Sequence, residues 1–126
     1  MPLEHVNPAN LAPPRGYTHV VKAGNIVFVA GQVGRKPDGT LAGPDITSQA
    51  DQVFKNLQAA LSSVGAGLKD ITKITTFLTH REDATAYRAV REKYLKQNPP
   101  ASTLLFISGL AEAEFRIEIE ATAVKP

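Results

Sequence analysis

The sequence predicts a single α+β domain over residues 1–126, in which two helices cover one face of a β-sheet. Two observations predict this class. Several segments are β-branched or alternate apolar and polar side chains, as strands do, and two segments repeat apolar side chains at helical spacing. The expected order along the chain is β-β-β-α-β-α-β-β. A length of 126 residues and a hydrophobic content of 43% suit one domain with its own core.

The first third of the chain is expected to form a short strand and then a hairpin. L-E-H-V-N at 3–7 favours a strand, and a Pro-rich passage follows it. The segments 16–22 and 25–33 read as two strands joined at Ala23-Gly24-Asn25, which is typical of a tight turn. Residues 35–44 hold two glycines and two prolines, so they are expected to form a loop.

The first helix is expected to begin near Ser48, which with Asp51 three residues later resembles a capping box. Apolar side chains recur at three-and-four spacing from Ala50 to Val64, and Gly65 is expected to end the helix.

The β-branched segment 70–79 predicts a strand after this helix. Asp83 is expected to cap a second helix with an apolar stripe over 84–95, and Pro99-Pro100 mark the end of this helical segment.

Two strands close the chain, at 102–108 and 115–124. The last one reads F-R-I-E-I-E-A, so Arg116, Glu118 and Glu120 are expected on one face and the apolar side chains on the other. A solvated outer face with cross-strand ion pairs is the simplest interpretation of these charges.

Two other strands are apolar on both faces, which changes that interpretation. In 26–33, Ile26, Phe28 and Ala30 are expected on one side, and Val27, Val29 and Val33 on the other. The strand 102–108 is also apolar on both sides. Such strands are buried on both faces, whereas two helices cover only one. The sequence therefore predicts a homo-oligomer in which the second face packs on another subunit. Glu118 and Glu120 would then line a subunit boundary, where partial burial raises a carboxyl pKa.

The composition excludes several classes of site. The chain has no cysteine, so disulfides, thiolate zinc sites and thiol nucleophiles are excluded, and no metal is expected. The 14 basic and 12 acidic residues nearly balance, and no basic run indicates nucleic-acid binding. No apolar run is long enough to span a membrane, and the N-terminus lacks signal-peptide features, so a cytoplasmic protein is expected.

The segments Y-T-H-V-V-K-A-G-N-I-V-F-V-A-G-Q-V, F-L-T and I-E-I-E-A-T-A-V, in this order, resemble the RidA (YjgF, perchloric-acid-soluble protein) family over nearly the whole chain. The resemblance implies a chorismate-mutase-like fold assembled as a homotrimer, with a small metabolite bound in clefts between subunits. It also implies hydrolysis of reactive enamines and imines, such as 2-aminoacrylate and its imine, to keto acids and ammonia. No metal or organic cofactor is implied.

The resemblance also implies site residues. Tyr17 matches the family's cleft tyrosine, although Arg15-Gly16 precede it here in place of Gly-Pro. Gly31 matches the glycine whose backbone N–H meets the ligand carboxylate. Glu120 matches the glutamate that positions the attacking water. Glu118 is expected to be an interface or ion-pair residue, with Arg116 or a neighbouring subunit's lysine as its partner.

The sequence departs from the family at the carboxylate-binding arginine. Deaminating members read P-A-R-S or P-A-R-T, whereas Pro100-Ala101-Ser102-Thr103 puts Ser102 at the arginine position. Losing such a pair is expected to cost about 2–5 kcal/mol of binding to an amino-acid imine. Arg88 either reaches the cleft and replaces the arginine or is a solvated helix residue beside Arg91.

Three hypotheses follow. The first is a cofactor-independent hydrolase or deaminase acting on a small imine, enamine or related carbonyl compound, carried by Tyr17, Gly31 and Glu120. The second is a non-catalytic trimer that binds a small metabolite or a partner protein, which Ser102 favours. The third is a nuclease or translation inhibitor, but the sequence lacks the basic patch interleaved with aromatic residues and the histidine pair that cleavage of a nucleic acid needs.

Overall fold

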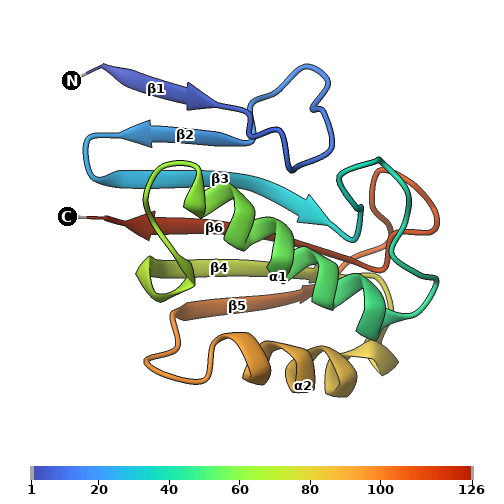
Figure 1. The fold of residues 1–126 in the computed structure, drawn as a ribbon. Coiled ribbons are helices and arrows are strands. Elements are labelled where there is room, and N and C mark those ends of the chain that lie inside the picture. Colours follow the sequence, from blue (N-terminus) through green and yellow to red (C-terminus); the bar gives the residue numbers. More distant parts are fainter. Residues whose placement is uncertain (1, 126) are drawn as a thin grey trace.

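The computed structural model describes residues 2–125 and confirms the expected order of elements (Figure 1). The strands are β1 (Leu3–Val6), β2 (Val20–Ala23), β3 (Ile26–Val33), β4 (Ile71–Leu78), β5 (Ala101–Phe106) and β6 (Ile117–Val124). The helices are α1 (Ile46–Ser62) and α2 (Ala84–Tyr94), and the short 3₁₀ turns η1 (Leu68–Asp70) and η2 (Arg81–Asp83) precede β4 and α2 respectively.

The six strands form one sheet in the order β1-β2-β3-β6-β4-β5. The C-terminal strand β6 thus lies in the middle, antiparallel to both β3 and β4. Only β4 and β5 are parallel, because α2 carries the chain back to the starting end of the sheet between them. This central position of β6 places the two glutamates of the F-R-I-E-I-E-A segment among neighbouring strands on both sides.

The core lies between the sheet and α1, which crosses the sheet diagonally in Figure 1. Phe54 and Leu57 of α1 are fully buried, as are Ile117 and Ile119 of β6. Apolar residues at helical spacing therefore meet apolar residues at strand spacing, as the sequence predicted.

The opposite face of the sheet, called the free face below, is not covered by any described residue of this chain. Ile26 and Phe28 of β3 are 37% and 47% exposed, and Leu105 of β5 is 43% exposed. The expectation that these strands are apolar on both faces is confirmed.

The helix caps differ from the expectation. α1 begins at Ile46, and the Asp45 side chain accepts a 2.9 Å hydrogen bond from the Ser48 N–H, so Asp45 and not Ser48 is the cap. Asp83 stands at the start of α2 but makes no side-chain cap hydrogen bond. Its carboxylate instead accepts from Arg116 Nε at 2.8 Å and Nη2 at 3.1 Å, because a bidentate charged pair outweighs a cap.

Candidate functional site

A β-bulge in β3 organises the candidate site. Val29 lies opposite Ala121 and Gln32 lies opposite Ile119, so Ala30 and Gly31 together oppose Glu120. The extra residue reverses the alternation of side chains beyond it. Gln32 therefore turns into the core, where it is 4% exposed, and Val33 pairs with Glu118 on the free face. The prediction that Val33 shares a face with Val27 and Val29 was wrong because the sequence pattern does not reveal the bulge.

Glu118 packs directly against this bulge. A β-carbon added to Gly31 would lie 2.7 Å from Glu118 Cδ and in still closer conflict with Oε2, so only glycine leaves room for the carboxylate. Glu118 lies across from Val33 of β3 and Phe77 of β4. Burial among these neighbours, and then the charge of Glu120, raises the pKa of Glu118.

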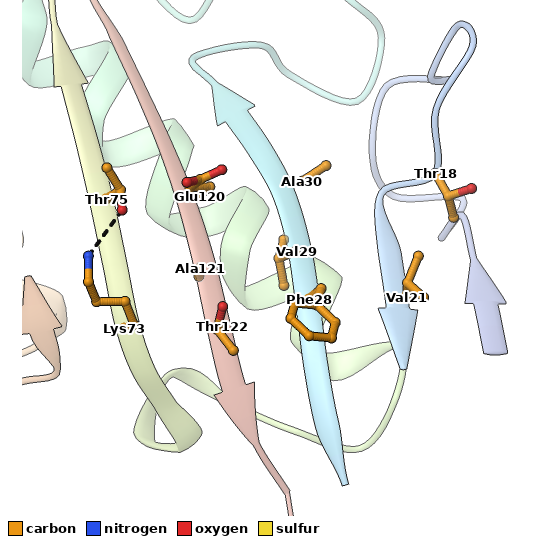
Figure 2. Close-up of a pocket in the computed structure, with 10 residues that line it drawn as sticks. All are labelled: Thr18, Val21, Phe28, Val29, Ala30, Lys73, Thr75, Glu120, Ala121 and Thr122. Atoms are coloured by element: carbon orange, nitrogen blue, oxygen red, sulfur yellow. Dashed lines mark hydrogen bonds between the residues drawn. The ribbon is translucent and has the colours of Figure 1, made fainter. Parts of the chain in front are cut away.

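Glu120 lies one pair further along β6 in more polar surroundings. Its neighbours across the strands are the bulge and Thr75, and the side chain is exposed. Glu120 lines an open hollow of about 410 Å³ on the free face, together with Phe28, Lys73 and Thr122 (Figure 2). The expectation that Glu118 and Glu120 share a face apart from the core is confirmed.

Tyr17 and Gly31 meet at a second, smaller hollow of about 50 Å³ at the end of β3. Tyr17 is 52% exposed, and its ring packs edge-on against His19 with 5.5 Å between centroids. His19 Nε2 bonds to the Ala12 carbonyl at 2.7 Å, and its Nδ1 lies 3.1 Å from Gln32 Nε2. A carbonyl only accepts and an amide nitrogen only donates, so Nε2 carries the proton and both ring nitrogens are engaged.

The same network fixes the bulge. Gln32 Nε2 also donates to the Ala30 carbonyl at 3.0 Å, and the Ala30 N–H donates to the His19 carbonyl at 2.9 Å. His19 is therefore a structural residue, and it holds the backbone that Glu118 contacts.

Ser102 and Arg88 lie away from these residues within one chain. Ser102 pairs with Ile74, which is buried beneath the helices, so its side chain points to the helix-covered face. There it lines a hollow of about 260 Å³ with Arg91 and Lys96. Arg88 is exposed on α2, on the helix-covered side of the sheet. One chain therefore brings Tyr17, Gly31 and Glu120 to the bulge but leaves Ser102 and Arg88 apart.

The ion pair expected between Arg116 and Glu118 is not formed. Arg116 pairs with Asp83 at 2.8 Å and lies 4.0 Å from Glu82, so it ties β6 to η2. The pairing raises the pKa of Arg116, chiefly through the hydrogen bond to Asp83. Sequence alternation alone put Arg116 and Glu118 on one face, but Arg116 precedes β6 and is free to turn toward Asp83.

Lys73 is a functional candidate that the sequence interpretation missed. It lies on the free face between Thr122 of β6 and Ala101 of β5, and its Nζ donates to Thr75 Oγ1 (Figure 2). Its position four residues before Phe77 in a β-branched strand could have placed it on this face, but no motif singled it out.

Within residues 2–125, no three His, Cys, Asp or Glu side chains gather as metal ligands would. No helix in that range is long and apolar enough to cross a membrane.

Comparison with known proteins agrees with the fold. The model of the family described as "Endoribonuclease L-PSP" matches residues 8–125. A RutC family protein of Pyrococcus abyssi is 34% identical over 110 residues, covering 86% of each chain. The protein named 2-iminobutanoate/2-iminopropanoate deaminase of Dermatophagoides farinae is 31% identical over 110 residues, covering 86% of this chain and 84% of its own.

Among solved structures, yeast Mmf1 superposes with a TM-score of 0.95 at 27% identity, covering 99% of this chain and 100% of its own. The sheet with two helices on one face is the chorismate-mutase-like α+β fold that these proteins share. With a family model that spans nearly the whole described chain, the protein belongs to the Endoribonuclease L-PSP family, which is the RidA/YjgF/RutC family.

Proposed function

We propose that this protein is a cofactor-independent hydrolase that deaminates a small reactive imine or enamine to a carbonyl compound and ammonia. The observation that carries the proposal is the half-buried Glu118 carboxylate packed against the Gly31 backbone. The deaminase name of the Dermatophagoides relative supports the same reaction class.

In this reaction the carboxylate aims a water at the imine carbon. As the water oxygen bonds to that carbon, the carboxylate takes one proton from the water, and the C=N bond becomes a single bond. The carboxyl then gives this proton to the nitrogen, takes the remaining proton from the new hydroxyl group and passes it to the same nitrogen. The C–N bond breaks as the C=O bond forms, and ammonia leaves. Burial raises the pKa of the Glu118 carboxyl, which makes its carboxylate a stronger base for taking the proton of the water. Tyr17 and the Gly31 N–H are the proposed substrate-binding groups.

The glutamate assignment has two candidates. The family resemblance placed the water-positioning role on Glu120, which faces the bulge from the polar side. The contact with Gly31 and the raised pKa favour Glu118, so we assign the proton transfers to Glu118 and test both residues.

We further propose that three copies assemble through their free faces. Ile26, Phe28 and Leu105 are exposed there in one chain, and a soluble protein rarely leaves such a group of large apolar side chains uncovered. Assembly would convert the free face into clefts between subunits. Ser102 and Arg88 lie on the helix-covered side, but β5 is the edge strand and both residues are exposed, so a neighbouring chain could bring them to the rim of such a cleft. A cytoplasmic location and the absence of a nucleic-acid partner remain expectations from the sequence.

The second candidate function is a non-catalytic trimer that binds a small metabolite or a partner protein. The position of Ser102 favours it, because a serine on the helix-covered face supplies neither the charge nor the fork of donors of an arginine.

Ammonia release separates the two candidates. Imines would be generated in situ by an amino-acid oxidase from neutral and acidic amino acids, with and without the protein. We expect the protein to accelerate ammonia and keto-acid release from at least one class. No acceleration with either class would reject the hydrolase and leave the binding protein.

A further inference from the structure

We propose that the hollow beside Glu120 binds the carboxylate of a small metabolite through the Lys73 ammonium and the hydroxyls of Thr75 and Thr103. The free face presents these groups in adjacent rows across three strands. Lys73 of β4 lies beside Ala101 and Thr122, and the next row along the strands is Thr103, Thr75 and Glu120.

The Lys73 ammonium is oriented but not neutralised. Its Nζ donates to the Ile74 carbonyl at 3.0 Å and to Thr75 Oγ1 and Thr103 Oγ1 at 3.1 Å each. All three acceptors are uncharged, and among residues 2–125 no carboxylate lies within ion-pair distance of Lys73. A half-buried cation with neutral partners keeps an electrostatic preference for an anion.

The two threonines add directed donors. Each hydroxyl accepts its bond from the ammonium, so its own O–H stays free to donate, and the neighbouring cation polarises it. The three N–H donors of the ammonium are engaged, so it attracts a carboxylate by its charge, while the two hydroxyls can each donate to one of the carboxylate oxygens. Phe28 and Val21 line the same hollow and offer apolar contact for the rest of the molecule (Figure 2).

The spacing connects this site to the proposed reaction. Thr75 and Phe77 are two residues apart on β4, so the Thr75 row lies about 7 Å from the row that holds Glu118. A carboxylate on Thr75 and Thr103 would leave the reactive carbon of a small acid within reach of Glu118. Lys73 would thus supply the positive charge for the carboxylate that the family's arginine supplies at the position of Ser102. The role of the bound acid as substrate rests on the proposed function, whereas the binding site does not.

Isothermal titration with pyruvate and with its neutral amide, pyruvamide, tests the site. We expect the wild type to bind pyruvate about tenfold or more tightly than pyruvamide, because only pyruvate carries the charge. Lys73→Met should remove this preference and Lys73→Arg should retain it. Lys69→Met, which changes an exposed lysine in η1, should leave it intact. Glu120→Gln should tighten pyruvate binding, because it removes a like charge from the same hollow.

A wild type without preference for pyruvate, or one that binds neither compound, would overturn the proposal. So would Lys73→Met that keeps the preference. If Lys73 and Glu120 served only to stabilise the sheet, Lys73→Met and Glu120→Gln would both lower the thermal stability, while the preference for pyruvate over pyruvamide stayed unchanged. If the protein binds pyruvate selectively but does not accelerate imine hydrolysis, the proposed hydrolase is rejected and the carboxylate site is retained. If it hydrolyses imines but shows no preference for pyruvate over pyruvamide, the carboxylate site is rejected and the hydrolase is retained.

Discussion

At the scale of single residues, the molecule separates two glutamates that look alike in the sequence. Both stand on the same face of β6, two residues apart. Glu118 lies between Val33 and Phe77 and touches Gly31, whereas Glu120 lies beside Thr75 in an open hollow. Burial therefore raises the pKa of Glu118, and the two carboxylates are prepared for different chemistry.

This difference predicts how stability changes with pH. A carboxyl whose pKa is raised by folding costs free energy when ionised, so its contribution becomes unfavourable as pH rises through the unfolded value of 4.5 toward the folded one. Glu118→Gln should be more stable than the wild type at about pH 7 and lose that advantage below about pH 4. Urea denaturation at both pH values measures this. The exposed Glu92→Gln serves as the control, and an equal effect in both variants would contradict the assignment.

Gly31 gives a second prediction at this scale. Gly31→Ala places a methyl group 2.7 Å from Glu118 Cδ, so the carboxylate must move from the bulge. We expect turnover to fall by about 100-fold, since misplacing a catalytic group by about 1 Å has that effect. Steady-state kinetics on the imine measure it. Gly109→Ala, where an added β-carbon would contact nothing, is the matched control. Unchanged kinetics in Gly31→Ala would remove Glu118 from the mechanism.

At the scale of elements, side chains from α1 fix where β6 begins. The buried Gln49 donates to the Gly43 and Glu114 carbonyls at 3.0 Å each and accepts from the Arg116 N–H at 2.8 Å. Arg116 is held in turn by Asp83. Helix α1 and turn η2 thus set the register of β6, and with it the positions of Glu118 and Glu120.

Removing this link should destabilise the fold. Gln49→Leu removes three part-buried hydrogen bonds from one backbone N–H and two carbonyls, which we expect to cost about 2–3 kcal/mol. Gln52→Leu on the same helix loses only a bond to Asn56 and should cost about 0.5 kcal/mol. Chemical denaturation measures both. Equal losses would mean that Gln49 does not anchor β6.

A second link joins α1 to the end of α2, and its effect on stability changes with pH in the opposite sense to that of Glu118. The Asp51 carboxylate of α1 accepts hydrogen bonds from Tyr94 and Lys93 at the end of α2. The hydrogen bond from Tyr94, and then those from Lys55 and Lys93, lower the pKa of Asp51 from 3.8 to about 2. Its stabilising contribution is present above the unfolded value and is lost as pH falls through about 2.

The element order was predictable because it depends on local periodicity. Apolar side chains alternate with polar ones in β6 and recur at helical spacing in α1, so the sequence of each segment predicts its secondary structure. The bulge at Ala30-Gly31, the pairing of Arg116 with Asp83 and the position of Lys73 were missed, because they depend on partners distant in sequence. Which of the two glutamates lies against Gly31 is also of this kind, since only the fold shows that it is Glu118.

At the scale of the whole molecule, the free face predicts assembly. Phe28 is exposed at its centre between β2 and β6. Light scattering should give the wild type a mass about three times the chain mass of 13.5 kDa. Phe28→Asp should give the mass of a single chain, because a carboxylate buried in the contact is unpaired. Ala89→Asp, on the exposed side of α2, should remain assembled. A wild type of single-chain mass would refute the assembly.

In the proposed mechanism, the Glu118 carboxylate at Gly31 performs the proton transfers of imine hydrolysis. The most direct test is the rate of ammonia release from an oxidase-generated imine, measured for the wild type, Glu118→Gln and Glu120→Gln. We expect a loss of about 100-fold or more in Glu118→Gln, as for the removal of a general base, and a much smaller loss in Glu120→Gln. A Glu118→Gln protein that keeps wild-type turnover, or a loss confined to Glu120→Gln, would contradict this mechanism.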